Sequence, residues 1–199
     1  TLASATGILP FLRIFYTRYG KRACPNCGHE SVIRTQDEIV DHLLNKAGQG
    51  SVSLWVSLMR GVRGSHSTLL RYLVQEFGKG ALQVDNQVYV QGYALDPAQP
   101  HDFSVRIGVY GPDLTPVEVR AALRRVRALG SRLLLVQFGP ETETMSLGSV
   151  CAGCGHRIAE LQPTHFNRSC SHCDGAGCER CFQTGLFPAA AAVRWQNLS

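Results

Sequence analysis

The chain has 199 residues, of which 44% are hydrophobic and 18% are charged, and its formal net charge is +5. This composition is typical of a soluble chain of one or two domains and argues against a disordered coil, because apolar content is high and net charge is low. The longest apolar stretch, residues 8–16, is interrupted by Pro10 and Arg13, which predicts no membrane span. The chain begins without Met and without a signal-peptide pattern, so we expect a cytoplasmic segment of a longer protein.

The first half of the chain mixes helical and strand patterns. Apolar residues at helical spacing predict amphipathic helices over residues 6–19 and 36–47. Residues 51–58 alternate apolar and polar side chains, which predicts a half-buried strand. A basic, glycine-rich turn over residues 60–66 follows, and a further helix is expected over residues 69–77.

Short strands and one hairpin are predicted next. Residues 82–84 and 88–90 have the strand pattern, with Asp85 starting the two-residue turn that joins them. Residues 103–109 alternate again and predict a longer strand. Residues 133–138 are expected to form the last strand before a cysteine-rich tail.

The helix between the last two of these strands has clear boundary signals. Thr115, Pro116 and Glu118 supply an N-cap, a first-turn proline and a capping-box acid, and Gly130 ends the helix. The fold class is therefore α/β (α+β mixed), with a compact inserted domain between an N-terminal helix and a C-terminal zinc-knuckle segment. The expected bounds are 1–23 for the helix, 24–138 for the inserted domain and 139–199 for the tail.

All eight cysteines fall into Cys-x-x-Cys pairs, which are Cys24/Cys27, Cys151/Cys154, Cys170/Cys173 and Cys178/Cys181. Local pairs in a chain of this length favour metal binding over a disulfide scaffold. Fifteen residues separate the second pair from the third, which is close to the spacing of a two-knuckle zinc ribbon. We therefore predict zinc at Cys151, Cys154, Cys170 and Cys173.

A second zinc is suggested by an internal repeat. Residues 170–185 are two tandem copies of Cys-x-x-Cys-x-x-x-Gly, CSHCDGAG and CERCFQTG. The second site would then combine the remaining cysteines, Cys24, Cys27, Cys178 and Cys181. Free thiols or a redox pair are the alternatives. With eight cysteines available, we expect the nearby histidines to lie on the surface or beside the ligands; these are His29, His156, His165 and His172.

Two groups of basic residues are further candidates. Arg60, Arg63 and His66 crowd one turn and suggest a contact with a partner. A stripe at helical spacing is either a solvated helix face or a contact for DNA phosphates or acidic partner groups; it comprises Arg120, Arg124 and Arg127.

The sequence contains no candidate catalytic site. A phosphate-binding loop needs Gly-x-x-x-x-Gly-Lys-Ser/Thr, and the nearest stretch, residues 61–68, has His66 and Ser67 where Gly-Lys is required. No ABC signature or Walker B motif is found either. We therefore expect no ATP hydrolysis and no enzyme activity from this chain alone.

Several stretches occur in a recognisable order. GILPFLRIFYTRYG precedes CPNCG, and RGVRGSHSTLL, QVDNQVY and HDFSVRIGV follow. The tail then combines CAGCG, Glu160-Leu161-Gln162-Pro163 and CSHCDGAG. This series covers nearly the whole chain and resembles the first ATP-binding half of the UvrA family, the damage-sensing ATPases of bacterial nucleotide excision repair.

The resemblance implies a role for each region. The inserted domain would dock a UvrB-like helicase through Arg60, Arg63 and His66, and the flanking segments would belong to the ATP-binding lobe. The implied cofactors are Zn²⁺ and, only in the full-length parent, ATP; the parent would bind double-stranded DNA and form a homodimer. The stretch between the zinc pairs is shorter than usual, and the tail from Cys178 resembles a segment that the family places after a further insertion. The chain thus resembles an abbreviated or paralogous UvrA.

Two functions from other classes stay open. A zinc-ribbon module could bind nucleic acid through the arginine stripe, in which case its affinity would fall steeply with salt. A thiol-active zinc chaperone would instead exchange disulfides.

Overall fold

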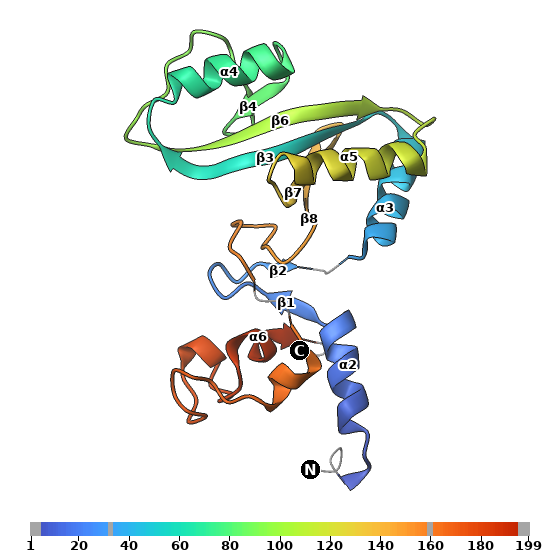
Figure 1. Cartoon of the computed structure of the whole chain (residues 1–199), viewed down its shortest axis with the longest axis vertical. Coiled ribbons are helices and arrows are strands. Elements are labelled where there is room, and N and C mark those ends of the chain that lie inside the picture. Colours follow the sequence, from blue (N-terminus) through green and yellow to red (C-terminus); the bar gives the residue numbers. More distant parts are fainter. Residues whose placement is uncertain (1–4, 32–33, 159–160, 195–199) are drawn as a thin grey trace. The chain divides into compact units, whose positions relative to one another are not determined.

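The computed structural model describes residues 5–31, 34–158 and 161–194, which belong to two compact units (Figure 1). Unit 1 is formed by Thr1–Ile33 and Ser149–Ser199, and unit 2 is Arg34–Gly148. Glu160 of the Glu-Leu-Gln-Pro stretch lies outside the described residues. None of the described helices has the length and apolar character needed to cross a bilayer.

Unit 2 is built on one antiparallel sheet of six strands in the order β5-β4-β6-β3-β7-β8. In chain order the strands are β3 (Val52–Arg63), β4 (Leu82–Val84), β5 (Gln87–Val88), β6 (Pro100–Tyr110), β7 (Leu133–Phe138) and β8 (Glu141–Ser146). The long strands β3 and β6 are neighbours at the centre, and their register pairs Val52 with Tyr110 at one end and Arg63 with Pro100 at the other.

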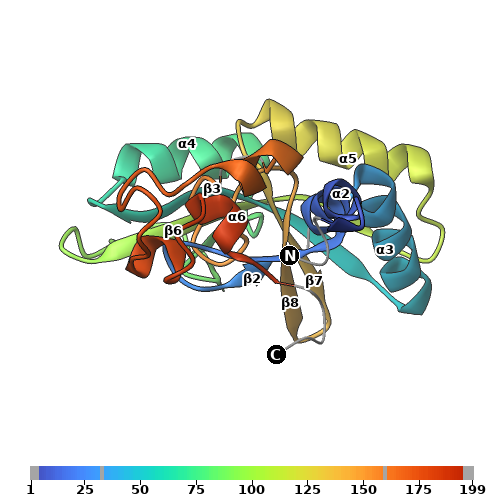
Figure 2. The same cartoon turned by 90° about the horizontal axis from the view of Figure 1, so that it is seen from below.

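Three helices cover one face of this sheet, namely α3 (Gln36–Gln49), α4 (Ser67–Phe77) and α5 (Pro116–Ala128). Figure 2 shows α4 and α5 on the same side of β3 and β6. Their apolar stripes join the inward residues of the strands in one core, with Leu43, Leu54, Phe103 and Val119 almost fully buried. A capping box starts α5 at Thr115, as expected, and an equivalent one starts α3.

The structure extends two of the predicted elements. Strand β3 continues to Arg63, past the expected end at residue 58, so Arg60 and Arg63 lie on the strand and the turn is shorter. The prediction that residues 133–138 form the last strand before the tail was wrong, because β8 pairs with β7 along its whole length. β8 is a polar edge strand with Met145 as its buried side chain, so it lacks the apolar pattern of a central strand.

Unit 1 contains the N-terminal helix and the cysteine-rich tail. Its elements are α2 (Leu9–Tyr19), β1 (Lys21–Ala23), β2 (Glu30–Ser31), η1 (Pro163–Asn167), η2 (Glu179–Cys181), α6 (Pro188–Ala191) and β9 (Val193–Arg194). A small antiparallel sheet in the order β2-β1-β9 joins the two ends of the chain, with Arg22 opposite Val193. A Cβ at Gly20 would overlap the Val193 side chain, so this junction between α2 and β1 requires glycine.

The unit bounds correct one expectation. The inserted domain was expected over residues 24–138, but the first cysteine pair belongs to unit 1, and β8 belongs to unit 2. The physical reason is strand pairing: β1, which precedes Cys24, pairs with β9 from the tail, while β8 extends the large sheet.

Candidate metal centres

The first cluster joins the first two cysteine pairs along the chain and comprises Cys24, Cys27, Cys151 and Cys154. The Sγ atoms of Cys24 and Cys154 are 3.7 Å apart, as are those of Cys27 and Cys151, and all four sulfurs lie within 4.8 Å of one another. Zn–S bonds of ~2.3 Å in a tetrahedron put the sulfurs about 3.8 Å apart. The first cluster therefore has the dimensions of a tetrahedral zinc site.

The two halves of the first cluster repeat one local structure. Both have the sequence Cys-x-x-Cys-Gly-His, and in each the first cysteine N–H donates to the carbonyl of the histidine, at 2.9 and 2.8 Å. Gly28 and Gly155 donate their N–H groups back to the carbonyl of the first cysteine, at 2.8 and 2.9 Å. Both glycines have positive φ, 71° and 73°, a conformation that a residue with a Cβ adopts at a cost.

The second cluster is local and comprises Cys170, Cys173, Cys178 and Cys181. Sulfur–sulfur distances are 4.0 Å for Cys170–Cys178, 3.9 Å for Cys173–Cys181 and 3.8 Å for Cys178–Cys181, and all four sulfurs again lie within 4.8 Å. Cys170 and Cys181 are fully buried and the other two cysteines are partly buried, so this cluster is largely shielded from water.

The tandem repeat of the sequence is a structural repeat as well. Each copy has two consecutive residues with positive φ, Asp174 and Gly175 in the first copy and Phe182 and Gln183 in the second. Gly175 and Gln183 each lie two residues before the closing glycine of their copy. The closing glycines face these residues across the repeat. A Cβ on Gly177 would meet the Gln183 carbonyl, and a Cβ on Gly185 would meet the Gly175 carbonyl. The two copies therefore pack against each other around the four sulfurs.

The grouping of cysteines differs from the one expected from spacing. Spacing along the chain predicts Cys151/Cys154 with Cys170/Cys173 and leaves Cys24/Cys27 for Cys178/Cys181. The structure instead groups Cys24/Cys27 with Cys151/Cys154, and Cys170/Cys173 with Cys178/Cys181. The physical reason is that unit 2 brings its own ends together: Arg34, its first residue, is ion-paired at 2.8 Å with Glu143 on its last strand. The signal that could have found the grouping is the shared Cys-x-x-Cys-Gly-His sequence.

Hydrogen bonds to sulfur lower the pKa of one thiol in each cluster, whereas burial and hydrogen bonds to neighbouring sulfurs raise the pKa of Cys178 to about 11, and bonds to the sulfurs of the first cluster raise that of Cys27 to about 12. In the second cluster, the backbone N–H groups of Gly177 and Cys178 donate to Cys173 and Cys181, at 3.2 and 3.1 Å. Burial raises the pKa of Cys154, but hydrogen bonds from the His156 backbone and the Asn26 amide outweigh it and lower the pKa to about 6. In Cys181, burial is likewise outweighed by backbone hydrogen bonds, which lower its pKa to about 6. Such sites suit a divalent cation, because metal binding requires deprotonated sulfur.

The histidines near the pairs take no ligand position in the described clusters, which consist of cysteine alone. His29, His156 and His172 are exposed. A Cβ on Gly153 would lie 2.9 Å from His29 Cγ, so the His29 ring packs against the opposite knuckle of the first cluster. The His165 ring lies 4.9 Å from the Phe187 ring and accepts a hydrogen bond from the Gln162 N–H at 3.3 Å.

The first basic group lies at one end of the large sheet, and we call residues 60–66 the basic segment. Arg60 and Arg63 end β3, Arg63 is exposed, and Arg60 Nε donates to the Ser57 hydroxyl at 3.3 Å. His66 precedes α4 in the left-handed conformation, with φ 47°, and its ring lies 5.2 Å from the Phe103 ring. The structure thus keeps these three residues on one continuous segment.

The arginine stripe on α5 is partly engaged within unit 2. Arg120 is ion-paired with Asp37 at 3.0 Å, and Arg127 donates to the Gln36 amide oxygen at 3.4 Å, both on α3. Arg124 is exposed between them. The stripe therefore helps to hold α5 beside α3, which favours the interpretation as a solvated, partly paired helix face.

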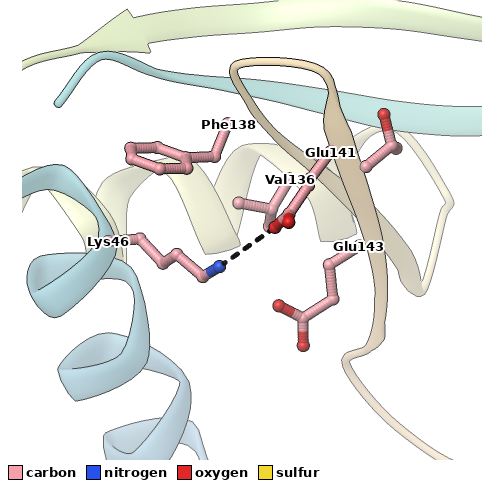
Figure 3. A pocket seen from close by; sticks show the side chains of 6 residues that line it. Lys46, Val136, Phe138, Glu141 and Glu143 are labelled. Atoms are coloured by element: carbon pink, nitrogen blue, oxygen red, sulfur yellow. Dashed lines mark ion pairs between the residues drawn. The ribbon is translucent and has the colours of Figure 1, made fainter. Parts of the chain in front are cut away.

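A shallow pocket of about 500 Å³ lies between α3 and the β7–β8 hairpin (Figure 3). Its floor is apolar, formed by Val136 and Phe138, and its charged side chains are already in ion pairs. Lys46 is 3.9 Å from Glu141, and Glu143 is held by Arg34 and His42, each at 2.8 Å. None of the site residues expected from the sequence lines this pocket.

Comparisons with known proteins agree with the motif series. No protein-family model matches the chain. The chain is 28% identical to UvrABC system protein A of Clostridium acetobutylicum, over 89% of this chain and 20% of that protein. It is 27% identical to the same protein of Thermus thermophilus, over 94% of this chain and 21% of that protein, and 25% identical to that of Bacillus subtilis. The chain thus spans about a fifth of the length of the curated relatives it matches, and over that span it is UvrA-like.

Proposed function

We propose that this chain is the zinc-holding and partner-docking part of a UvrA-like protein of nucleotide excision repair. The observation that carries the proposal is the pair of all-cysteine tetrahedra in a chain that is similar along most of its length to UvrABC system protein A. ATP hydrolysis, homodimer formation and binding of double-stranded DNA belong, in this proposal, to a larger cytoplasmic parent protein.

In this proposal the metal is structural. Each cluster offers four thiolates and leaves no open position for a substrate or a reactive water. The eight cysteines would hold Zn²⁺, and the metal charge would stabilise four sulfurs that otherwise repel one another as thiolates. The first cluster would fix the two chain segments between which unit 2 is inserted, since its halves flank residues 28–150.

Unit 2 would supply the docking surface for a UvrB-like helicase. Arg63 is exposed at the end of β3, and Arg60 and His66 lie on the same segment. Guanidinium groups suit bidentate pairing with carboxylates of a partner protein. Because unit 1 has eight Lys and Arg against four Asp and Glu, most of the net charge of +5 lies outside unit 2. Docking through the basic segment would therefore depend on local contacts rather than on the charge of the whole unit.

The test combines metal analysis with binding. The purified, reduced chain should contain two zinc ions, and it should bind a UvrB-like helicase in low salt. Arg63→Ala should weaken binding about tenfold, which corresponds to roughly 1.4 kcal/mol. Arg124→Ala is the matched control, because it removes an arginine that is also exposed but lies on α5.

Three results would contradict the proposal. Absence of zinc would remove the structural role of the clusters, and absence of a complex at low salt, with both zinc ions bound, would remove the docking role. Equal loss of affinity in Arg63→Ala and Arg124→Ala would place the contact elsewhere or make it nonspecific.

Nucleic-acid binding is a second candidate, favoured by the excess of positive charge on unit 1. It predicts an affinity for duplex DNA that falls steeply with salt, as counterions are released from phosphates. Because Arg120 and Arg127 are engaged by α3, alanine at the stripe should change this affinity little, whereas Arg168→Ala and Arg180→Ala should lower it.

A further inference from the structure

A buried histidine lies at the start of β6, close to the basic segment. The side chain of His101 is only 9% exposed. Its Nδ1 is 2.7 Å from Asp85 Oδ2, and its Nε2 is 2.9 Å from the Asp96 carbonyl oxygen. Both neighbours are acceptors, so both ring nitrogens can donate at once only when the ring is an imidazolium.

The charged groups facing His101 come from two elements. Asp85 lies in the β4–β5 turn, and Asp96 lies in the loop before β6. On the strand beside it, β3 places the uncharged Val62 opposite His101 and Arg63 opposite Pro100. The acidic residues that face the ring are thus Asp85 and Asp96, and the strand register places Arg63 opposite Pro100 rather than opposite His101.

Hydrogen bonds continue from His101 to the basic segment. Asp85 Oδ1 accepts from the Asp102 N–H at 2.8 Å, and Asp102 Oδ1 accepts from the Gly61 N–H at 2.7 Å. Gly61 has φ 61° and lies in a bulge where the register of β3 shifts between Met59 and Val62. This bulge sets the directions of the arginines on either side of it, Arg60 and Arg63.

We propose that His101 is a positioning residue whose imidazolium joins Asp85 to the Asp96 carbonyl at the end of the sheet, and that loss of its proton loosens the basic segment. We call these two hydrogen bonds the clamp. The consequence for docking rests on the proposed function, but the clamp itself does not. When the ring is neutral, one nitrogen presents a lone pair to an acceptor less than 3 Å away, so the contact with Asp85 or with Asp96 must open.

The electrostatics give the direction of the pH dependence. The hydrogen bond to Asp85, followed by the one to Asp96, raises the pKa of His101 above its ordinary value. The clamp therefore contributes fully below the ordinary histidine pKa of about 6.5, and the contribution is lost as pH rises through the raised pKa. Burial raises the pKa of Asp85, but the hydrogen bonds from His101 and from the Asp102 N–H outweigh it, so the pKa of this carboxyl is lowered from its ordinary value.

Nuclear magnetic resonance of the full, zinc-loaded chain tests the clamp without a partner. The imidazole C2 proton of His101 should titrate above pH 6.5, and the protection of the Gly61 amide against hydrogen exchange should fall about tenfold through the same pH range. Asp85→Asn preserves the size of the turn residue but removes its charge, so the titration midpoint should move down toward the ordinary value. His101→Gln should remove the pH dependence of the Gly61 protection factor.

His42→Gln is the matched control, because His42 is also paired with a carboxylate, Glu143 at 2.8 Å, but joins α3 to β8 instead. It should leave the Gly61 protection factor unchanged. The proposal would be overturned if His101 titrated at its ordinary pKa in the wild-type chain. It would also be overturned if the Gly61 protection factor did not change as His101 loses its proton.

A binding experiment tests the consequence of the clamp for docking. Affinity for a UvrB-like helicase should weaken several-fold through the His101 titration in the wild-type chain and not in His101→Gln. Absence of binding at every pH would refute the proposed function, while the exchange measurement would still decide the clamp.

Discussion

Gly185 closes the second copy of the tandem repeat and tolerates no side chain. Its φ is +70°, and a Cβ would overlap the Gly175 carbonyl of the first copy. The backbone is left-handed at this position, and the atom that a Cβ would meet also belongs to the backbone. No side-chain rotation can therefore relieve the overlap. The tight packing of the two copies, and with it the shape of the second cluster, depends on this glycine.

Gly185→Ala should therefore destabilise unit 1 by about 2 kcal/mol and speed zinc release from the second cluster. Competition with a chromophoric chelator measures the release. Gly48→Ala is the control, because Gly48 lies in α3 with open space where its Cβ would be, and alanine favours helix by roughly 0.5–1 kcal/mol. Equal release rates in Gly185→Ala and wild type would contradict the packing argument.

At the scale of elements, the structural grouping and the grouping expected from spacing give opposite predictions for two double variants. With the structural grouping, Cys24→Ser with Cys151→Ser damages one site, and the chain should retain one zinc ion. Cys151→Ser with Cys170→Ser damages both sites and should leave neither intact. The grouping expected from spacing predicts the reverse, so metal analysis of the two proteins decides between them.

Contacts between the two ends of unit 2 explain how the two halves of the first cluster can meet although they are far apart in sequence. Residues 28–150 separate the two halves of the first cluster, but loop-closure entropy grows only with the logarithm of length. Folding of unit 2 also lowers this entropic cost, because the 2.8 Å ion pair between Arg34 and Glu143 holds the first residue of the unit close to its last strand. The entropic cost of a metal site between distant knuckles is therefore only modestly larger than that of a site between neighbours.

At the scale of the whole molecule, the two units are stabilised by different forces. Unit 2 has an apolar core without cysteine, from Ile39 of α3 to Met145 of β8. Among its described residues, unit 1 has small apolar clusters, two of which are built around the cysteines themselves. Small cores of this kind rarely suffice without a metal or disulfide.

Chelation of zinc should therefore unfold unit 1 and leave unit 2 folded. We expect the amide signals of β3 and β6 to persist in excess chelator, while those of residues 170–185 collapse to the unfolded range. Lowering the pH should have the same selective effect, because protons compete with metal for the thiolates. Simultaneous loss of signals from both units would show that they fold as one cooperative system.

Much of the secondary structure follows from local chemistry and could be predicted. The Thr115 capping box fixes the start of α5, and the Asp85-Asn86 turn, with φ 53° and 64°, joins β4 to β5 as its residue types indicate. Strand β8 could not be predicted in the same way, since an edge strand with mostly polar side chains has no apolar alternation. Its clue, the two-residue Gly139-Pro140 connection after β7, is recognised only once a partner strand is considered.

The sequence by itself determined the chemistry of this protein: eight thiols in four Cys-x-x-Cys pairs, a tandem repeat, and an ordered series of UvrA-like motifs. Tertiary structure decided which pairs meet, because ligand spacing counts residues along the chain, whereas coordination depends on distance in space. It also decided that the first cysteine pair belongs with the tail, through the pairing of β1 with β9, and that His101 lies between two acceptors. Contacts between residues far apart in sequence leave no local pattern, so they become evident only when the chain is folded.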